Sequence, residues 1–478
     1  MWNRQMLKRN LSYCMIFLTA YPVLFFTACE KREEPQPEVH YVWTYKQVQI
    51  GDMSYNLDTL HKAAEVTKYD SERTKVEIPS TVEFRAKQYV VVKCIGDRAF
   101  YNCTNLASVS IPYGVTSIGE EAFAGCTNLD HISIPKSVNH IGRVAFFNCS
   151  SLTSITLSPG ITIIEHGVFN SSGIKDIAIP NKVVKIDDEA FIFCSNLVSI
   201  AIPNSVTSIG YSAFERCTSL KNISIPNSVT AIGGMAFFGC SKLTNISLPN
   251  SVTDIGLWAF DGCNSLSNPI FNAHVFAYLP RSYSGTYTIP QNIAVIAGGA
   301  FMNCNSLTNI TIPNSVTCIG EFSFAQCSRL SNINIPSSIT DIRGSTFEGC
   351  SSLRQISIPN SVISIGSCAF RGCINLQTIT IPNSVICIYS AAFEGCAGMK
   401  DITILAIPES DIRIRELAFA NCTGLKSITC DAITPPICDD YVFYNVEKSI
   451  PLYIPAGREY AYQIAKGWQD FTNIQTLH

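Results

Sequence analysis

The chain has 478 residues, of which 47% are hydrophobic and only 15% are charged. This composition supplies a large core and excludes a disordered chain. The 34 Lys and Arg residues nearly balance the 37 Asp and Glu residues, so the net charge is only −3. Because no basic excess is present to contact phosphates, we expect no nucleic-acid partner.

The N-terminus has the features of a secretory signal. Arg4, Lys8 and Arg9 precede an apolar run over residues 11–26, and small residues follow this run. A basic start, an apolar stretch too short to span a membrane and small residues before a cleavage site are typical of signal peptides. We therefore predict a signal peptide over residues 1–28.

The sequence Phe26-Thr27-Ala28-Cys29 resembles the lipobox of bacterial lipoproteins, in which the cysteine receives lipid and becomes the first residue of the mature chain. Phe26 replaces the leucine that is usual there, and an ordinary signal with an incidental Cys29 is the alternative. Residues 29–40 are charged and proline-bearing, which predicts a solvated tether. Their acidic start resembles the surface-export signal of lipoproteins from some Gram-negative anaerobes, with a plain spacer as the alternative. We expect lipidation at Cys29 and an outer-membrane anchor, with the protein exposed at the cell surface.

A phenylalanine, usually preceded by alanine, recurs through most of the chain. The intervals are 23 residues except for single intervals of 22, 41 and 26. The fourteen copies are Phe100, Phe123, Phe146, Phe169, Phe191, Phe214, Phe237, Phe260, Phe301, Phe324, Phe347, Phe370, Phe393 and Phe419. Self-similarity at this period predicts one repeat solenoid in place of several globular domains.

One clean repeat covers residues 106–126. It begins with an alternating β-branched run that Pro112 ends, which predicts a short, half-buried strand. Gly119 allows a tight corner, and Phe123 and Cys126 then fill the interior. One such coil cannot bury its apolar side alone, so neighbouring coils must stack.

This pattern resembles the BspA-like leucine-rich repeats, written Leu-x-x-Ile-x-Ile-Pro-x-x-Val-x-x-Ile-Gly-x-x-Ala-Phe-x-x-Cys. The resemblance runs from about Ile78 to the C-terminus. It implies a leucine-rich-repeat solenoid, a right-handed, horseshoe-like α/β coil that is rich in β structure, with short strands on its concave face. It also implies an N-terminal cap and first hairpin over residues 41–98, repeats over 99–430 and a C-terminal cap over 431–478.

Cysteine is unusually frequent, and 13 of the 21 cysteines occupy one position of the repeat. They are Cys103, Cys126, Cys149, Cys194, Cys217, Cys240, Cys263, Cys304, Cys327, Cys350, Cys373, Cys396 and Cys422. A disulfide framework is one interpretation for an exported protein. Buried thiols packed coil on coil are the favoured one, because side chains that point inward in parallel fit disulfide geometry poorly. No Cys-x-x-Cys pair occurs, and we expect neither a metal site nor a cofactor.

Motifs of catalysis are missing from the sequence. The seven histidines form no His-Glu-x-x-His, and neither a Gly-x-Ser-x-Gly elbow nor a phosphate-binding Gly-x-x-x-x-Gly-Lys loop occurs. We therefore predict that the protein is not an enzyme.

The candidate ligand-binding surface is the outward side of the repeat strands. Its residues are Ser108, Ser110, His131, Ser133, Ser154, Thr156, Asn222, Ser224, Asn245, Ser247, Asn309, Thr311, Asn332, Asn334, Gln355 and Ser357. A broad sheet of hydroxyls and amides suits a protein ligand and lacks the aromatic platform that usually holds sugars. Polar residues placed there only for solubility are the alternative.

One irregular segment, residues 268–290, lengthens the 41-residue interval. Tyr278, Tyr283 and Tyr287 make it a possible second binding site, since insertions in solenoids often carry recognition. The favoured alternative is an irregular coil in which Phe271, Phe276 and Tyr278 pack in the core.

The family resemblance implies adhesion, in which the repeats bind host matrix proteins, cell-surface proteins or other cells. A glycan-binding accessory lipoprotein of an outer-membrane polysaccharide-uptake system is the first alternative, and an enzyme on a repeat scaffold is the least favoured. We expect protein partners, with glycans as the alternative, and contact with the membrane through the lipid anchor.

Overall fold

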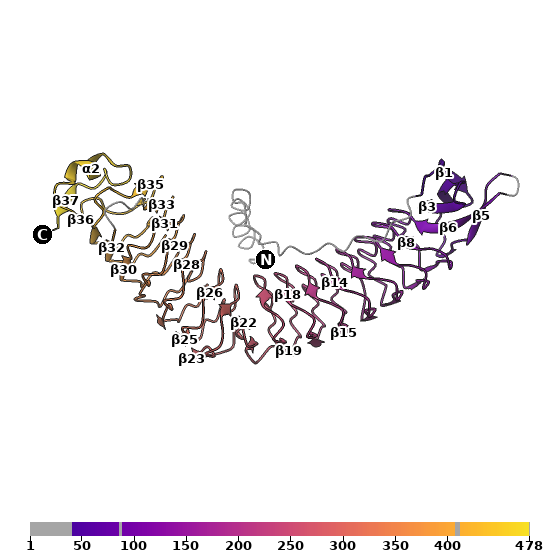
Figure 1. Cartoon of the computed structure of the whole chain (residues 1–478), viewed down its shortest axis with the longest axis horizontal. Coiled ribbons are helices and arrows are strands. Elements are labelled where there is room, and N and C mark those ends of the chain that lie inside the picture. Colours follow the sequence, from indigo (N-terminus) through magenta and orange to yellow (C-terminus); the bar gives the residue numbers. More distant parts are fainter. Residues whose placement is uncertain (1–40, 86–87, 407–411, 478) are drawn as a thin grey trace. The chain divides into compact units, whose positions relative to one another are not determined.

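The computed structural model describes residues 41–85, 88–406 and 412–477, and by their contacts residues 43–478 form one unit. The predicted signal peptide, Cys29 and the tether lie outside the described residues. Figure 1 shows the chain from residue 41 onward as a succession of short coils that follow one another in sequence order.

Two parallel ladders run along the coils, because most coils contribute one strand to each. The strands of the first ladder are β4 (Lys75–Glu77), β7 (Ser108–Ser110), β9 (His131–Ser133), β11 (Ser154–Thr156), β13 (Asp176–Ala178), β15 (Ser199–Ala201), β17 (Asn222–Ser224), β19 (Asn245–Ser247), β23 (Gly285–Thr288), β25 (Leu307–Thr311), β27 (Asn332–Ile333), β30 (Thr378–Ile381), β32 (Asp401–Ile404), β34 (Ser427–Cys430), β36 (Pro451–Ile454) and β37 (Asn473–Thr476). Each residue faces its equivalent in the next coil, as Ile155, Ile177 and Ile200 do. The repeat period therefore equals one coil.

The second ladder was not foreseen as strands, since it consists mostly of two-residue segments. They are β8 (Ser117–Ile118), β10 (His140–Ile141), β12 (Ile163–Ile164), β14 (Lys185–Ile186), β16 (Ser208–Ile209), β18 (Ala231–Ile232), β20 (Asp254–Ile255), β22 (Val275–Tyr278), β24 (Val295–Ile296), β26 (Cys318–Ile319), β28 (Asp341–Ile342), β29 (Ser364–Ile365), β31 (Cys387–Ile388), β33 (Arg413–Ile414) and β35 (Ile437–Cys438). An additional strand, β21 (Ile270–Phe271), pairs antiparallel with β22.

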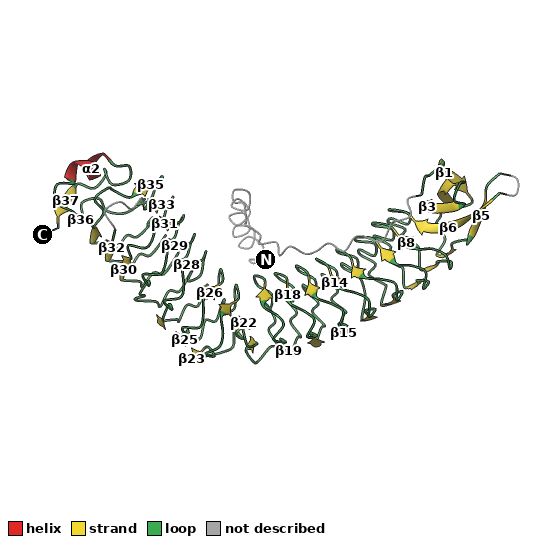
Figure 2. Ribbon diagram, in the orientation of Figure 1, coloured by secondary structure: helices red, strands yellow, loops and turns green. Residues whose placement is uncertain are grey.

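The remaining side of each coil is a run of turns that carries the repeat phenylalanine and cysteine. Figure 2 shows how little of the chain is regular, with short yellow strands joined by green turns. Helix α2 (Glu459–Ile464) follows the repeats, and no coil of the described chain has the helical side of an α/β horseshoe. The solenoid is thus built of strands and turns.

The first coil is preceded by a small sheet. Strands β1 (Tyr45–Ile50), β2 (Met53–Asp58) and β3 (Ala63–Tyr69) pair antiparallel, and β3 pairs in parallel with β6 (Tyr89–Ile95). Strand β5 (Thr81–Glu83) completes a hairpin with β6, which leads into the second ladder through β8. This sheet extends the second ladder and covers the core at that end.

At the other end the repeat geometry continues past residue 430. Phe443 stacks on Phe419, with 5.7 Å between ring centroids. Trp468 and Phe471 then pack against Phe443, each with a centroid distance of 5.2 Å. Because Trp468 is fully buried, these rings close the core at this end.

The predicted phenylalanine column is a stack of buried rings. From Phe100 to Phe260, and again from Phe276 to Phe443, consecutive rings lie 4.7–5.7 Å apart with interplanar angles of 1–21°. In the irregular coil the ring of Phe276 stacks on Phe301, while Leu279 holds the backbone position of the repeat phenylalanine, and the core divides into two clusters there. The 41-residue interval therefore contains one additional coil.

The repeat cysteines are thiols that hydrogen-bond the neighbouring coil. Eleven of them donate to the carbonyl oxygen of the phenylalanine one coil earlier, over 3.0–3.2 Å, as Cys240 does to Phe214. All cysteines of the described chain are free. The packing interpretation therefore holds, and the disulfide framework is not present in these residues.

The serine of the Pro-Asn-Ser turn has a similar role. Ser205 and Ser228 donate to the carbonyl oxygens of Val183 and Val206, each over 2.6 Å. The hydroxyl thus joins these coils to the previous ones, whereas the Ser251 hydroxyl of the equivalent turn is buried without a hydrogen-bond partner.

We predict that Phe237→Ala lowers the free energy of unfolding by about 3–5 kcal/mol, since it empties a buried site between two stacked rings. The Phe237 ring lies 5.4 Å from Phe214 and 5.5 Å from Phe260. Phe238→Ala is the matched control, because this adjacent phenylalanine is only half-buried. Guanidinium denaturation followed by circular dichroism measures both, and equal losses would contradict the role of the stack.

We also predict a loss of stability at high pH. Burial raises the pKa of Cys194, Cys240 and Cys373 from the ordinary 9.0 to about 12. Below pH 9 these thiols are protonated in both states, whereas above it they ionise first in the unfolded chain. The free energy of unfolding should therefore fall from about pH 9 upward, by about 1.4 kcal/mol per pH unit for each thiol that unfolding exposes.

The measurement is the denaturation midpoint between pH 8 and pH 11, together with iodoacetamide labelling at pH 8. The twelve fully buried cysteines of the column should be alkylated only after unfolding. A midpoint that does not change with pH, or rapid alkylation of these thiols in the folded chain, would show that they are not buried as described.

Candidate functional site

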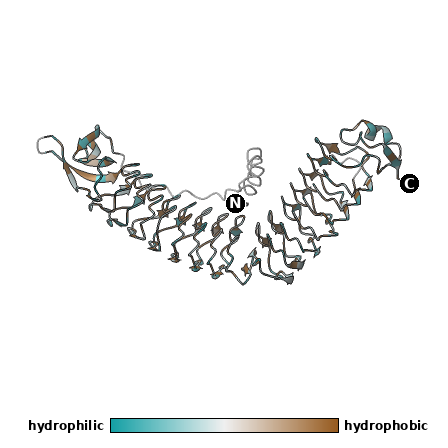
Figure 3. Cartoon of the chain, turned by 180° about the vertical axis from the view of Figure 1, so that it is seen from behind, coloured by the Kyte–Doolittle hydropathy of each residue, from teal (hydrophilic) through white to brown (hydrophobic). Residues whose placement is uncertain are grey.

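The strand face, meaning the outward residues of the first ladder, is the candidate site. Of the sixteen predicted residues, Ser108 and Asn309 are half-buried and the other fourteen are exposed. The cause is the alternation of each strand, which buries its central isoleucine or valine and turns both neighbours outward. Figure 3 shows hydrophobic and hydrophilic residues interspersed throughout the coils.

Most side chains of the strand face point to solvent, and a few form hydrogen bonds to an adjacent coil. Asn334 uses its amide on both the N–H and the carbonyl of Ile312, at 2.9 and 2.8 Å. Asn309 donates to Thr286 Oγ1 over 3.3 Å. Asn334 is therefore engaged in holding the coils, whereas the exposed hydroxyls and amides around it can contact a partner.

This face includes a larger and a smaller depression. The larger, of about 920 Å³, is open to solvent and spans β11, β13 and β15. The smaller, of about 330 Å³, is lined by Asn222, Ser224, Asn245 and Ser247 together with the central isoleucines of three strands. All four polar residues of the smaller depression were predicted from the sequence.

The larger depression includes residues that the sequence analysis missed. Thr156 was predicted, whereas Asp176, Ala178, Ser199 and Ala201 were not. These four occupy the same strand positions as the predicted residues, displaced by one or two coils. The signal that would have found them is position in the repeat, without regard to residue type.

The tyrosines of the irregular segment do not form a stacking platform. Tyr278 is only 4% exposed and belongs to the core, while Phe276 is fully buried. Tyr283 and Tyr287 are half-buried and pack edge to face, with 5.3 Å between centroids. Tyr278 is therefore not available to a ligand in this structure. Phe276 and Tyr278 pack in the core, as the structural interpretation expects, whereas Phe271 is 41% exposed.

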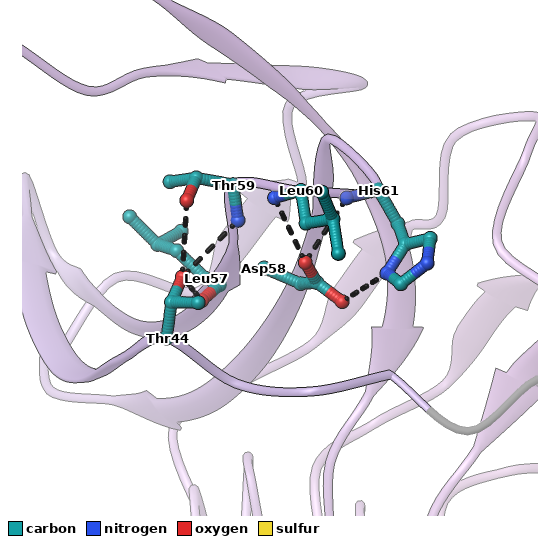
Figure 4. A network of polar contacts seen from close by, with 6 residues as sticks. All are labelled: Thr44, Leu57, Asp58, Thr59, Leu60 and His61. Carbon is teal, nitrogen blue, oxygen red and sulfur yellow. Dashed lines mark hydrogen bonds and ion pairs between the residues drawn. The ribbon is translucent and has the colours of Figure 1, made fainter.

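One histidine lies within hydrogen-bond distance of a buried carboxylate. Figure 4 shows that Asp58 Oδ2 lies 2.7 Å from Nδ1 of His61. Asp58 Oδ1 accepts the backbone N–H groups of Leu60 and His61, both over 3.0 Å. The carboxylate thus holds the turn between β2 and β3, which is a structural role.

The neighbouring hydroxyls in Figure 4 supply no nucleophile for this pair. Thr44 Oγ1 donates to the carbonyl oxygen of Leu57 over 2.9 Å and lies 3.2 Å from Thr59 Oγ1. These contacts of Thr44 and Thr59 hold the other side of the turn between β2 and β3. It does not form a chain of catalytic groups.

Two further histidines lie beside carboxylates on adjacent coils. The distance is 3.9 Å from His140 to Glu165 and 4.0 Å from His166 to Glu189. Burial raises the pKa of Glu165 more than the nearby His140 lowers it. These contacts are pairwise, and the described residues contain no group of three that could hold a metal ion.

The part of the chain that the structure describes also contains no helix long and apolar enough to cross a membrane.

Comparisons with known proteins agree with this architecture. Among solved structures, a leucine-rich repeat protein from Bacteroides ovatus ATCC 8483 shares 26% identity, covering 90% of this chain and 99% of its own, with a TM-score of 0.56. A leucine rich cell surface protein from Faecalibacterium prausnitzii A2-165 shares 32% identity, covering 80% of this chain and 94% of its own, with a TM-score of 0.50. No curated protein matches the chain.

The family model of the BspA type leucine rich repeat region matches residues 70–198, 184–279, 278–400 and 397–465. These ranges run through the repeats and into the C-terminal residues. With its stacked phenylalanines and its two ladders, the chain belongs to the BspA-type leucine-rich-repeat family.

Proposed function

We propose that this chain is a lipid-anchored adhesin of the cell surface that binds proteins through its strand face. Leucine-rich-repeat proteins of this kind are typically scaffolds for protein interaction and not enzymes. One observation carries the proposal: the strand face is exposed coil after coil, and both depressions lie on it. Hydroxyls and amides over so wide a surface suit a protein interface of standard size.

The charge and chemistry of this face support a protein partner over a sugar. Exposed side chains are chiefly Ser, Thr and Asn, which donate and accept hydrogen bonds. Tyr278, one of the three tyrosines of the irregular segment that could stack on a sugar ring, is buried. The protein partners we propose are host matrix or cell-surface proteins.

The proposed location rests on the N-terminal sequence. The lipobox-like Phe26-Thr27-Ala28-Cys29 and the acidic tether lie outside the described residues. The similar protein from Faecalibacterium prausnitzii is a cell surface protein, which supports the same location here. We propose an outer-membrane anchor at Cys29 with the repeats facing outward.

We predict that Asn222→Glu combined with Asn245→Glu weakens binding to a matrix protein at least tenfold. The two substitutions place charges without a partner at the centre of the strand face. The measurement is saturation binding of the purified chain to a plate of matrix proteins and polysaccharides at physiological salt.

The matched control is Ser208→Glu combined with Ala231→Glu, which puts the same charges on the second ladder of neighbouring coils. This position already holds Lys185 and Asp254, so charge is tolerated there. If the control weakens binding as much as the strand-face variant, the strand face is not the binding surface. Saturable binding to polysaccharides alone would overturn the adhesin proposal.

A separate prediction concerns the anchor. Cys29→Ala should leave the protein without lipid, so that it partitions into the aqueous phase of a Triton X-114 extraction, whereas the wild-type chain partitions into detergent. Protease treatment of intact cells should degrade the wild-type repeats if they face outward. Detergent partitioning of Cys29→Ala would show that another feature anchors the chain.

A further inference from the structure

The larger depression on the strand face coincides with several departures from the repeat. The step from Ile155 to Ile177 is 22 residues, where the steps on either side are 23. Ser158-Pro159-Gly160 alters the turn of the preceding coil, and Pro159 lines the depression. These features make this part of the face chemically unlike its neighbours.

Two exposed alanines line this depression. Along the outer column of the strands, Thr156 and Ser224 flank Ala178 and Ala201, and both alanines are exposed. Each alanine lacks the hydroxyl or amide that the same position carries in neighbouring coils. A side chain from outside can therefore lie flat on apolar atoms at a place where other coils present polar groups.

One carboxylate also lines the depression. Asp176 is exposed, and the Ser199 hydroxyl donates to its Oδ1 over 3.4 Å. Within the described residues, no ion pair joins Asp176 to a cation. Of the other lining groups, Lys182 carries a positive charge but lies beyond Pro180, past the far end of β13.

We propose that this depression binds an arginine side chain of the protein partner, an inference that rests on the proposed function and names its chemistry. The aliphatic stem lies across Ala178 and Ala201, and the guanidinium group donates to Asp176. Arginine fits better than lysine because its planar head binds a carboxylate bidentately and is weakly hydrated. Such a residue is a common anchor of protein interfaces.

The test uses the purified full chain with ¹³C-labelled alanine methyl groups and N-acetyl-arginine methylamide as the probe. The Ala178 and Ala201 methyl signals, assigned from Ala178→Ser and Ala201→Ser, should shift saturably as the probe is added. N-acetyl-citrulline methylamide, which has the same shape without the charge, should shift neither signal. Asp176→Asn should weaken binding by about tenfold, since a charge-assisted hydrogen bond is lost.

Asp401→Asn is the matched control, because Asp401 lies on the same face in β32 and accepts a hydrogen bond from Ser427 over 2.6 Å. It should leave the binding of the probe unchanged. Unmoved Ala178 and Ala201 signals, equal shifts with the citrulline probe, or equal binding by Asp176→Asn would each overturn the proposal. Shifts caused by an oligosaccharide and not by the arginine probe would do the same.

The outcome is separable from that of the adhesin proposal. The probe reports on the depression whether or not a matrix protein binds. Conversely, a matrix protein that binds Asp176→Asn as tightly as the wild-type chain would remove this subsite and leave adhesion through the strand face in place.

Discussion

The structure depends on one constraint: a single coil cannot bury its own apolar side. Each coil must therefore pack against the next coil with a surface of the same shape as the one that the previous coil packs against it. The constraint is met by equivalent residues lying directly over one another, as the rings of Phe191, Phe214 and Phe237 do within 5.4 Å of each other in turn. Cysteine thiols and turn serines add hydrogen bonds between coils, as Cys240 and Ser228 do by donating to backbone carbonyls one coil earlier. The residue types at inward positions are therefore restricted by the adjacent coils, whereas those at outward positions are not.

This division explains which parts of the fold could be predicted. Inward columns impose the 23-residue period on the sequence, so the phenylalanine column and the first strand followed from it. The second ladder did not follow, because two residues such as Ser117–Ile118 are too short to show an alternation. Nor did the left-handed backbone two residues before the phenylalanine, where Val144 and Trp258 have φ of 50° and 59°. Nothing in a valine or tryptophan indicates this conformation, which the packing of the coil imposes at some cost in energy.

The candidate site was predicted to a similar extent. Strand alternation identified the strand face, and fourteen of its sixteen predicted residues are exposed. It could not identify the larger depression, since a depression arises where a side chain is smaller than those of the adjoining coils. The side chain of Ala178 carries no polar group. It stands out only by comparison with Thr156, which lies beside it in the adjacent coil but 22 residues away in sequence. The burial of Tyr278 was equally hidden, because the irregular coil has no second copy with which it could be aligned.

The two irregular coils differ in what they change. The 41-residue interval interrupts the phenylalanine stack between Phe260 and Phe276 and divides the core into two clusters. The 22-residue step leaves the stack continuous, because Phe169 and Phe191 remain 5.4 Å apart with the planes turned by only 20°. The missing residue lies in the buried turn between Ser172 and Ile174, which leads into β13, one of the strands that line the larger depression. A change that keeps the phenylalanine stack continuous leaves the folding constraint satisfied, while outward residues such as Ala178 change what a partner contacts on the strand face.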